Sequence, residues 1–343
     1  MNLHPTSLIS KEWSVATLWI SNLLDTAQTL GIDRALLLPK IEITEAKLRD
    51  RNSHIPLQLW HQLAQEIQRI SGEQNIGIHY IQQNAAVAVG LLGMAAMTAP
   101  TLQQSWDTVV RYRHIVLNVG NTRFVETNDS VVMRWYPYSR AITDSKYLVD
   151  AIVSGWVINS RRLTGKKVIP LNVSLTHPTA EDTALFRSIY GDNVSLNQHY
   201  NSIEFRKEDW NLPVRYADKT VHHLLTTQAE KEASIFKSNL TVAETVEYHI
   251  KQQLPLGGAT VQSIANKINV SPRTLQRQLT KEGTHFKDLL DNARHELALD
   301  YLQEGTLSTL DIALKLGYNQ SSSFCTAFKG WTGISPSMYF ATK

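Results

Sequence analysis

Two similar segments near the carboxyl end of the chain constrain its fold more than any other feature. The first spans residues 261–279 and the second spans residues 310–328. Each has an Ile-Ala pair, followed four residues after the alanine by Asn269 or Gly317. A small alanine lets two helices approach closely, and Asn or Gly tolerates left-handed backbone at a tight turn. Two such copies about 48 residues apart predict tandem helix–turn–helix units, a stronger signal than a single copy.

The second helix of the first unit is expected to present a polar face to DNA. It opens with Ser271-Pro272, an N-cap residue followed by proline at the first helical position. If Leu275 and Leu279 are buried, an advance of about 100° per residue places the polar residues opposite or beside them. Arginine reads guanine, and glutamine reads adenine, through paired hydrogen bonds in the major groove. The predicted DNA contacts of this unit are Ser271, Arg273, Gln276, Arg277, Thr280 and Lys281.

The second unit offers a different outward face. Phe324 and Phe328 take the buried positions, and the predicted DNA contacts are Ser321, Ser322, Cys325, Thr326 and Lys329. These side chains are short and mostly uncharged, and hydroxyl groups contact phosphates or bases without strong base selectivity. We therefore predict an asymmetric reader, in which the first unit carries most of the base specificity.

One long helix is predicted between the two units, from Phe286 to about Gln303. About 18 residues at 1.5 Å each span roughly 27 Å, enough to hold two recognition helices about one DNA turn apart. Residues 241–343 contain 10 Lys+Arg and 9 Asp+Glu, so a basic surface requires segregation of the charges. We expect the following residues on one side: Lys267, Arg273, Arg277, Lys281, Lys287 and Arg294.

The preceding part of the chain mixes helical and strand patterns. Residues 13–70 have apolar residues at helical spacing, and residues 144–163 return to that spacing. Between them, two β-rich runs meet at Asn128-Asp129, which predicts a hairpin over residues 122–136. Helices interleaved with a small sheet predict an α+β domain.

This pattern divides the chain into three parts. The α+β domain, expected to bind an effector or dimerise, covers residues 1–225. A polar, weakly patterned run over residues 226–240 is predicted as the linker. The all-α domain with tandem helix–turn–helix units covers residues 241–343 and opens at a capping box, Thr241–Glu244.

Composition limits the possible partners and compartment. With a net charge of only +3, binding to nucleic acid requires a local patch rather than a basic chain. The single Cys325 excludes an intrachain disulfide and a cysteine zinc site, which fits a reducing compartment. The first residues lack a basic targeting pattern, and the longest uncharged apolar run, residues 85–100, is too short to cross a bilayer. We expect a cytoplasmic protein without a membrane partner.

The tandem segment closely resembles the AraC/XylS family of bacterial transcription regulators. The matching motifs are Ser271–Arg277, Gly317-Tyr318, Phe324, Ala327–Lys329 and Trp331–Tyr339, within about the last hundred residues. The resemblance implies a DNA-binding domain for an asymmetric promoter half-site and, usually, activation through RNA polymerase. Family members often have arginine at the positions of Thr326, Gly330 and Phe340.

The amino-terminal part is similar to the sensor domain of the subgroup that includes ornithine-utilisation regulators. The similarity rests on Gly90–Ala95, Ala99–Leu102 and the following hairpin. It implies effector binding and dimerisation, without naming the effector.

An enzyme is the first alternative, and the motifs argue against it. The chain has no Gly-x-Ser-x-Gly, Walker A or Gly-x-Gly-x-x-Gly pattern; Thr164–Lys167 lacks the hydroxyl residue and the upstream glycine of a phosphate-binding loop. Histidines His54, His61, His79 and His114 lack the spacing of metal ligands. We therefore predict no catalytic residue, no metal site and no cofactor.

A DNA-binding protein without an effector is the second alternative. Trp106, Tyr112, Trp135 and Trp156 can line an effector pocket, yet aromatic residues at helical spacing are also typical of an ordinary core. We expect the amino-terminal domain to sense a small molecule, to dimerise or to do both; without an effector it would only dimerise or bind another protein. Either way, the tandem units predict a DNA-binding transcription regulator with double-stranded DNA as its partner, and the family resemblance implies RNA polymerase as a second partner.

Overall fold

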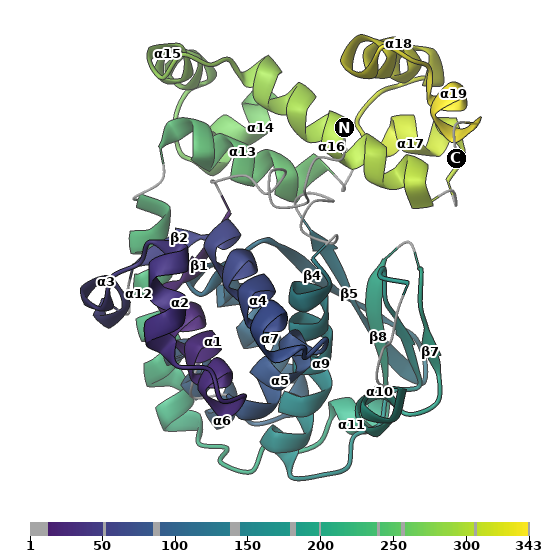
Figure 1. Cartoon of the computed structure of the whole chain (residues 1–343). Coiled ribbons are helices and arrows are strands. Elements are labelled where there is room, and N and C mark those ends of the chain that lie inside the picture. The colour runs from purple at the N-terminus through teal and green to yellow at the C-terminus, as the bar shows by residue number, and fades with distance from the viewer. Residues whose placement is uncertain are drawn as a thin grey trace. The chain divides into compact units, whose positions relative to one another are not determined.

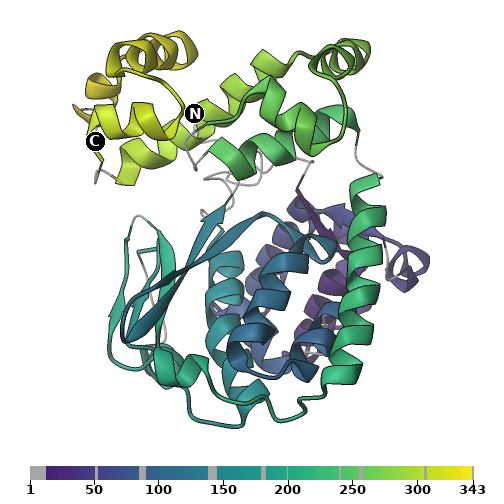
Figure 2. The same cartoon turned by 180° about the vertical axis from the view of Figure 1, so that it is seen from behind.

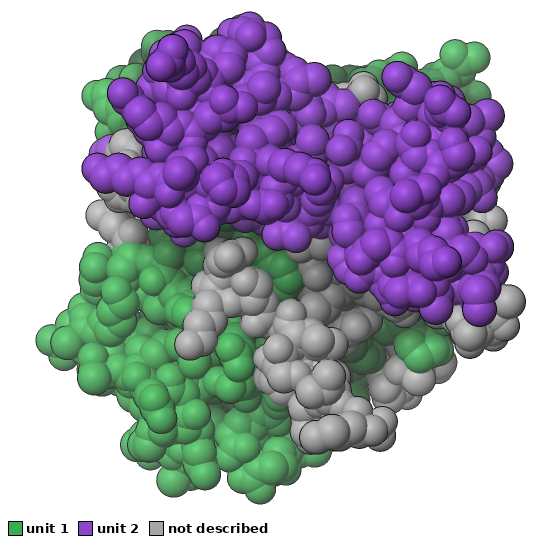
Figure 3. Space-filling model, turned by 90° about the horizontal axis from the view of Figure 1, so that it is seen from above, with its two compact units in different colours: residues 1–137, 141–233 green, residues 138–140, 234–343 purple. Residues whose placement is uncertain are grey.

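The computed structural model describes residues 13–50, 53–84, 90–137, 145–178, 183–198, 200–238, 241–254, 258–304 and 307–341. Contacts divide the chain into two compact units, coloured separately in Figure 3. The described residues of unit 1 end at Ala233, and those of unit 2 begin at Ser234. This boundary lies inside the segment predicted as the linker.

Unit 1 combines a group of helices with two β-sheets (Figures 1 and 2). Its helices are α1 (Thr17–Thr29), α2 (Arg34–Ile41), α3 (Glu45–Arg49), α4 (Leu57–Ser71), α5 (Ile76–Gln83), α6 (Leu91–Thr98), α7 (Leu102–Tyr112), the 3-10 helix η3 (Arg113–Ile115), α9 (Lys146–Thr164), α10 (Thr183–Tyr190), α11 (Lys207–Trp210) and α12 (Lys219–Ser238). The α+β class predicted for this part of the chain is confirmed.

The larger sheet has the strand order β4-β5-β8-β6-β7. Its strands are β4 (Gly120–Glu126), β5 (Ser130–Pro137), β6 (Asn172–Ser174), β7 (Val194–Ser195) and β8 (Asn201–Arg206). The predicted hairpin is confirmed, because β4 and β5 pair antiparallel around Asn128-Asp129. Val131 pairs with Phe205 and Met133 with Ile203, and all four side chains are fully buried against the helices.

The smaller sheet was not predicted. Its strands are β1 (Ser14–Ala16), β2 (His54–Pro56) and β3 (Leu117–Asn118), in the order β2-β1-β3. The prediction that residues 13–70 are helical is therefore wrong at two short segments. Val15 and Ile55 are paired and buried, so these segments gain their strand structure from partners distant in the sequence.

Helices α5 and α9 pack very closely. A Cβ atom at Gly77 would lie 2.9 Å from the backbone nitrogen of Ala151, so only glycine fits there. Arg162 of α9 donates hydrogen bonds to the carbonyl oxygens of Ile81, Gln82 and Asn84 at 2.8, 2.6 and 2.6 Å. These bonds satisfy the free carbonyl groups at the carboxyl end of α5.

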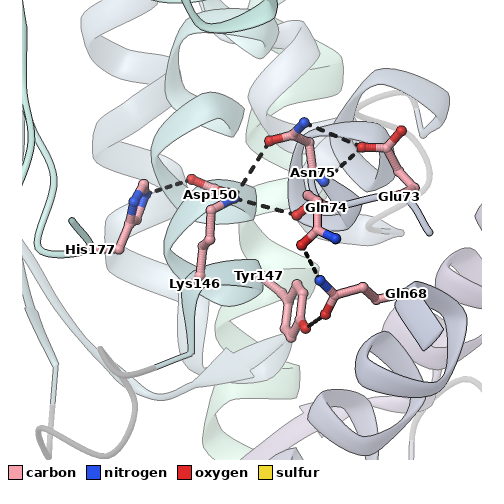
Figure 4. A network of polar contacts seen from close by, with 8 residues as sticks. All are labelled: Gln68, Glu73, Gln74, Asn75, Lys146, Tyr147, Asp150 and His177. Carbon is pink, nitrogen blue, oxygen red and sulfur yellow. Dashed lines mark hydrogen bonds and ion pairs between the residues drawn. The ribbon is translucent and has the colours of Figure 1, made fainter. Parts of the chain in front are cut away.

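A buried carboxylate network joins α9 to two loops (Figure 4). The carboxylate of Asp150 accepts from the ammonium of Lys146 and from a ring nitrogen of His177, each at 2.9 Å. Lys146 also reaches the side-chain oxygen of Asn75 at 3.5 Å. Because a buried charge must be paired, this network holds the loop before α5 and the loop after β6 against α9.

Helix α12 covers most of the segment predicted as a linker. It starts at Lys219, and its Ala229 and Ala233 are buried. A ring nitrogen of His222 lies 2.9 Å from the carbonyl oxygen of Ala95. Residues 226–238 are thus helical, the part up to Ala233 packs within unit 1, and residues 239–240 lie outside the described residues.

Unit 2 is all-helical, as predicted, with α13 (Val242–Gln253), α14 (Val261–Lys267), α15 (Pro272–Lys281), α16 (Phe286–Glu304), α17 (Thr309–Lys315), α18 (Ser321–Thr332) and α19 (Pro336–Ala341). The capping box of Thr241 and Glu244 is confirmed at the start of α13. Helix α16 confirms the predicted long helix, and its buried Ala293, Ala298 and Leu302 belong to the core that both helix–turn–helix units share.

Candidate nucleic-acid interface

The two helix–turn–helix units repeat the same turn in detail. In the first unit, the Val270 backbone donates to the carbonyl of Ala265 at 3.0 Å. In the second, Tyr318 donates to the equivalent Ala313 at 2.8 Å. Asn269 and Gly317 have φ values of 56° and 77°, the left-handed conformation expected at these turns. The tandem repeat inferred from the sequence is therefore a repeat of backbone geometry.

Helix α15 has the two faces that its sequence predicts. Leu275 and Leu279 are fully buried, which confirms the apolar side. The exposed side carries Arg273, Gln276, Arg277, Thr280 and Lys281. No ion pair joins Arg273, Arg277 or Lys281 to another residue in the described part of the chain. These cations are available for phosphate or guanine.

Ser271 has a structural role at the start of α15. Its hydroxyl oxygen accepts a hydrogen bond from the backbone nitrogen of Thr274 at 3.1 Å and lies 2.9 Å from the hydroxyl of that residue. The hydroxyl thus caps the helix. Its predicted contact with DNA remains a prediction and requires the hydroxyl to donate its hydrogen to a phosphate while its oxygen accepts the capping bond.

Helix α18 presents a less charged surface. Phe324 and Phe328 are fully buried, as expected. Ser322, Thr326 and Lys329 are exposed, whereas Ser321 is half-buried and the half-buried Cys325 packs against the core of unit 2. Thr326 donates its hydroxyl hydrogen to the carbonyl oxygen of Ser322 at 3.0 Å, so a contact of Thr326 with a phosphate requires that hydrogen bond to be exchanged. Lys329 is thus the one cation among the predicted contacts of this helix.

Helix α16 separates the two units. Its 19 residues span about 28 Å at 1.5 Å per residue, and α15 and α18 lie near its opposite ends in Figure 1. This length matches the spacing of about one DNA turn that two successive major-groove contacts require.

Arg294 does not belong to the free basic face on which the sequence analysis placed it. Its guanidinium donates to the carbonyl oxygen of Leu316 at 2.9 Å and lies 4.4 Å from the ring centroid of Tyr318. Asp291 is 3.8 Å away. Arg294 therefore ties α16 to the end of α17. Lys267 and Lys287, from the same predicted set, are exposed.

A second candidate site is a cavity inside unit 1, with a volume of about 170 Å³. Helices α1, α5, α6, α7 and α9 and strands β3, β4 and β5 all contribute to its lining. Trp106, Trp135 and Trp156 line it, three of the four aromatic residues considered from the sequence. Trp106 donates to the hydroxyl of Ser160 at 3.0 Å, so one edge of its ring is held in place.

Tyr112, the fourth aromatic residue, faces α12 instead. Burial raises the pKa of the Tyr112 hydroxyl, and its hydrogen bond to Glu230 raises that pKa further. Trp19, Tyr80 and Arg113 are among the further lining residues that the sequence did not single out for a pocket. They come from separate elements, so no local pattern could have grouped them.

The described residues contain no group of three His, Cys, Asp or Glu side chains that could hold a metal ion. His61 lies 2.7 Å from the hydroxyl of Ser145, and burial lowers its pKa to about 4. No helix in the described part of the chain is both long and apolar enough to span a membrane.

The fold and the repeated turn define a helix–turn–helix transcription regulator with an amino-terminal ligand-binding domain. Residues 31–214 match the model of the arabinose-binding domain of AraC transcription regulator, and residues 264–342 match a helix–turn–helix domain. The chain belongs to the AraC family of transcription regulators. It is a DNA-binding regulator and not an enzyme.

Known regulators resemble the chain over most of its length. It is 23% identical over 320 residues to the ornithine utilization regulator of Pseudomonas aeruginosa, covering 92% of this chain and 93% of that protein. It is 28% identical over 181 residues to the regulator VirS of Mycobacterium tuberculosis, covering 53% of each. The crystal structure of the regulator CdpR from Pseudomonas aeruginosa aligns at 18% identity with a TM-score of 0.42, covering 92% of this chain and 97% of that one.

Proposed function

We propose that this regulator reads two successive major-groove segments and that its two recognition helices contribute unequally. Helix α15 supplies most base contacts through Arg273, Gln276 and Arg277. Helix α18 anchors the domain mainly through Ser322, Thr326 and Lys329. The observation that carries the proposal is the contrast in charge between two exposed faces on the same repeated scaffold. Arginine and glutamine form bidentate base contacts, whereas short hydroxyl side chains chiefly bind phosphate.

The proposal assigns a regulatory role to the rest of the chain. Residues 1–225 bind an effector in the cavity and support dimerisation, residues 226–240 connect the two domains, and residues 241–343 bind DNA. Bound to its promoter in the cytoplasm, the regulator activates transcription through RNA polymerase. Membership of the AraC family supports these assignments.

Helix α12 is the proposed dimer contact. Val221, Leu224 and Ile235 are 40%, 64% and 59% exposed, and at about 100° per residue they fall within about 60° of one another on the helix surface. Exposed apolar stripes of this kind favour pairing between helices. Sedimentation should therefore show a dimer that Leu224→Lys weakens and Leu36→Lys does not, Leu36 being 61% exposed on α2. A monomeric parent chain would remove dimerisation from the proposal.

Selection from random DNA tests the proposed reading mode. The full chain is mixed with a randomised duplex library, and bound sequences are enriched over several rounds at fixed salt. We expect one site with two preferred segments whose centres lie about 10 base pairs apart, and with the stronger preference in one of them. Enrichment without any sequence preference would show that the chain binds DNA only through its backbone, against the proposal.

A further inference from the structure

The cavity of unit 1 has a single charged residue in its lining. That residue is Arg113, in the 3-10 helix that follows α7. The remaining lining residues are apolar, aromatic or neutral and polar. No ion pair joins Arg113 to a carboxylate among the described residues. The cavity therefore has a positive charge at its wall that no acidic side chain among the described residues balances.

The three nitrogen atoms of the Arg113 guanidinium differ in their hydrogen-bond partners. Nε donates to the carbonyl of Gly120 at 2.7 Å, and Nη1 donates to the carbonyl of Val110 at 2.6 Å. Nη2 is buried and has no hydrogen-bond partner in the described part of the protein. The first two bonds fix the guanidinium plane, so the third nitrogen is a preorganised donor that lacks an acceptor.

Trp19 and Asn159 are among the other lining residues that show the same feature. The indole nitrogen of Trp19 and the side-chain oxygen of Asn159 are buried without a partner among the described residues. Buried polar atoms are satisfied in nearly all folded proteins, and exceptions mark functional positions or missing partners. Arg113 Nη2 and Trp19 Nε1 are donors, and together they point to a ligand that supplies an acceptor, whereas the Asn159 oxygen is itself an acceptor.

The volume limits the size of that ligand. At about 170 Å³, the cavity is close to the roughly 150 Å³ of an engineered apolar cavity in another protein that accepts benzene. A molecule of about six to ten non-hydrogen atoms fits such a space. Trp106, Trp135 and Trp156 give the wall flat apolar faces, which suit a ring or a short branched chain.

We infer that this cavity binds a compact monocarboxylic acid, whose carboxylate accepts from Arg113 Nη2 and Trp19 Nε1 and whose apolar body packs against the tryptophans. The inference rests on the proposed effector role of residues 1–225 and names its ligand class. A carboxylate fits better than a neutral group because a guanidinium without a counter-ion in an apolar wall gains most from an anion.

Calorimetric titration of the full chain with matched probes tests the inference. Phenylacetate should bind, its neutral isostere 2-phenylacetamide should bind at least about tenfold more weakly, and dodecanoate should bind more weakly than phenylacetate because the volume of about 170 Å³ cannot take up its whole chain. 3-Methylbutanoate should also bind, because it shares the carboxylate and a compact apolar body. These comparisons use the unaltered chain, so they do not depend on whether a variant folds.

Substitutions locate the binding site. Arg113→Gln should weaken phenylacetate binding at least about tenfold, and Trp19→Phe should weaken it severalfold. Arg111→Gln removes an exposed arginine from the same helical region and should leave binding within about twofold. Equal affinity for phenylacetate and its amide, or equal loss for the two arginine variants, would overturn the inference.

The inference and the proposed reading of DNA can fail separately. If no compact acid binds while the chain still selects its two-segment DNA site, the ligand class is wrong and the DNA-reading proposal stands. If phenylacetate binds as described but DNA selection finds no preferred site, the cavity assignment holds and the proposed reading mode fails.

Discussion

Replacing Arg277 with alanine should both weaken and broaden DNA recognition. Arg277 is exposed on α15, and it forms no ion pair with another described residue. Leu275 and Leu279 hold the helix from its other side, so the substitution leaves the core intact. One bidentate arginine–guanine contact contributes about 1–3 kcal/mol, which corresponds to about a 5- to 150-fold increase in Kd at constant salt.

Fluorescence anisotropy provides the measurement. The parent chain and the variant are titrated with the selected site and with duplexes changed at one base pair each. The variant should lose discrimination at one position and keep it elsewhere. Thr326→Ala is the matched control on α18 and should cost less than about 0.5 kcal/mol, because the hydroxyl already donates within its own helix. Equal losses for both variants, or a uniform loss over all duplexes with Arg277→Ala, would refute the assigned role.

Three further predictions concern unit 1 and are measured by urea denaturation of the full chain. Gly77→Ala should lower the free energy of unfolding of unit 1 by about 3 kcal/mol, because the added methyl group clashes with α9. Gly330 is a helical glycine with open space around it, so Gly330→Ala is the control and should stabilise unit 2 slightly. Asp150→Asn should lower the free energy of unfolding by about 3 kcal/mol, because Lys146 and His177 lose a buried charged partner. Asp192 pairs with Arg187 at the surface, so Asp192→Asn is the control and should lower it by less than about 1 kcal/mol. Burial lowers the pKa of His61 from an ordinary 6.5 to about 4, so between these pH values the unfolded chain binds more protons than the folded chain. The free energy of unfolding should therefore fall by up to about 3 kcal/mol as the pH drops from about 6.5 to 4. His61→Gln should remove this dependence on pH. The close packing of α5 and α9 would be contradicted if Gly77→Ala were as stable as the parent chain. The role of the buried carboxylate would be contradicted if Asp150→Asn lost no more stability than Asp192→Asn. The assignment to His61 would be contradicted if His61→Gln kept the same dependence of stability on pH.

The carboxyl-terminal domain was predictable because its signals are local. The Ile-Ala pairs, the left-handed turn residues and the Ser271-Pro272 start each act within a few residues, and they agree with one another. Arg294 departs from this rule. Nothing in its immediate sequence shows that it pairs with Leu316 and Tyr318, which lie more than twenty residues further along the chain.

The amino-terminal domain was harder to predict because its short strands depend on distant partners. Ser14–Ala16 and His54–Pro56 have three residues each and pair across about forty residues of helical sequence. Helix α12 lacks a strong apolar pattern because its buried side is made largely by small residues, Ala229 and Ala233, and its exposed side carries Leu224 and Ile235. A polar linker and such a helix have similar composition.

The cavity shows a different limit of sequence reasoning. Trp106, Trp135 and Trp156 were recognisable as possible lining residues, but each is equally suited to a packed core. What distinguishes a site is the set of unpaired atoms at Arg113, Trp19 and Asn159. Hydrogen-bond partners are properties of the folded chain, so this distinction required the structure.

Site-directed cleavage of DNA tests most directly the central claim that α15 and α18 occupy successive major grooves. Cys325 is the only cysteine, so Cys325→Ser provides a background for Lys281→Cys on α15 or Lys329→Cys on α18, each labelled with an iron chelate. On the selected site, the two chelates should cut at positions about 10 base pairs apart, as a spacer helix of about 28 Å requires. Cuts at the same position, or cutting by only one of the two labelled chains while both bind the site, would contradict the account.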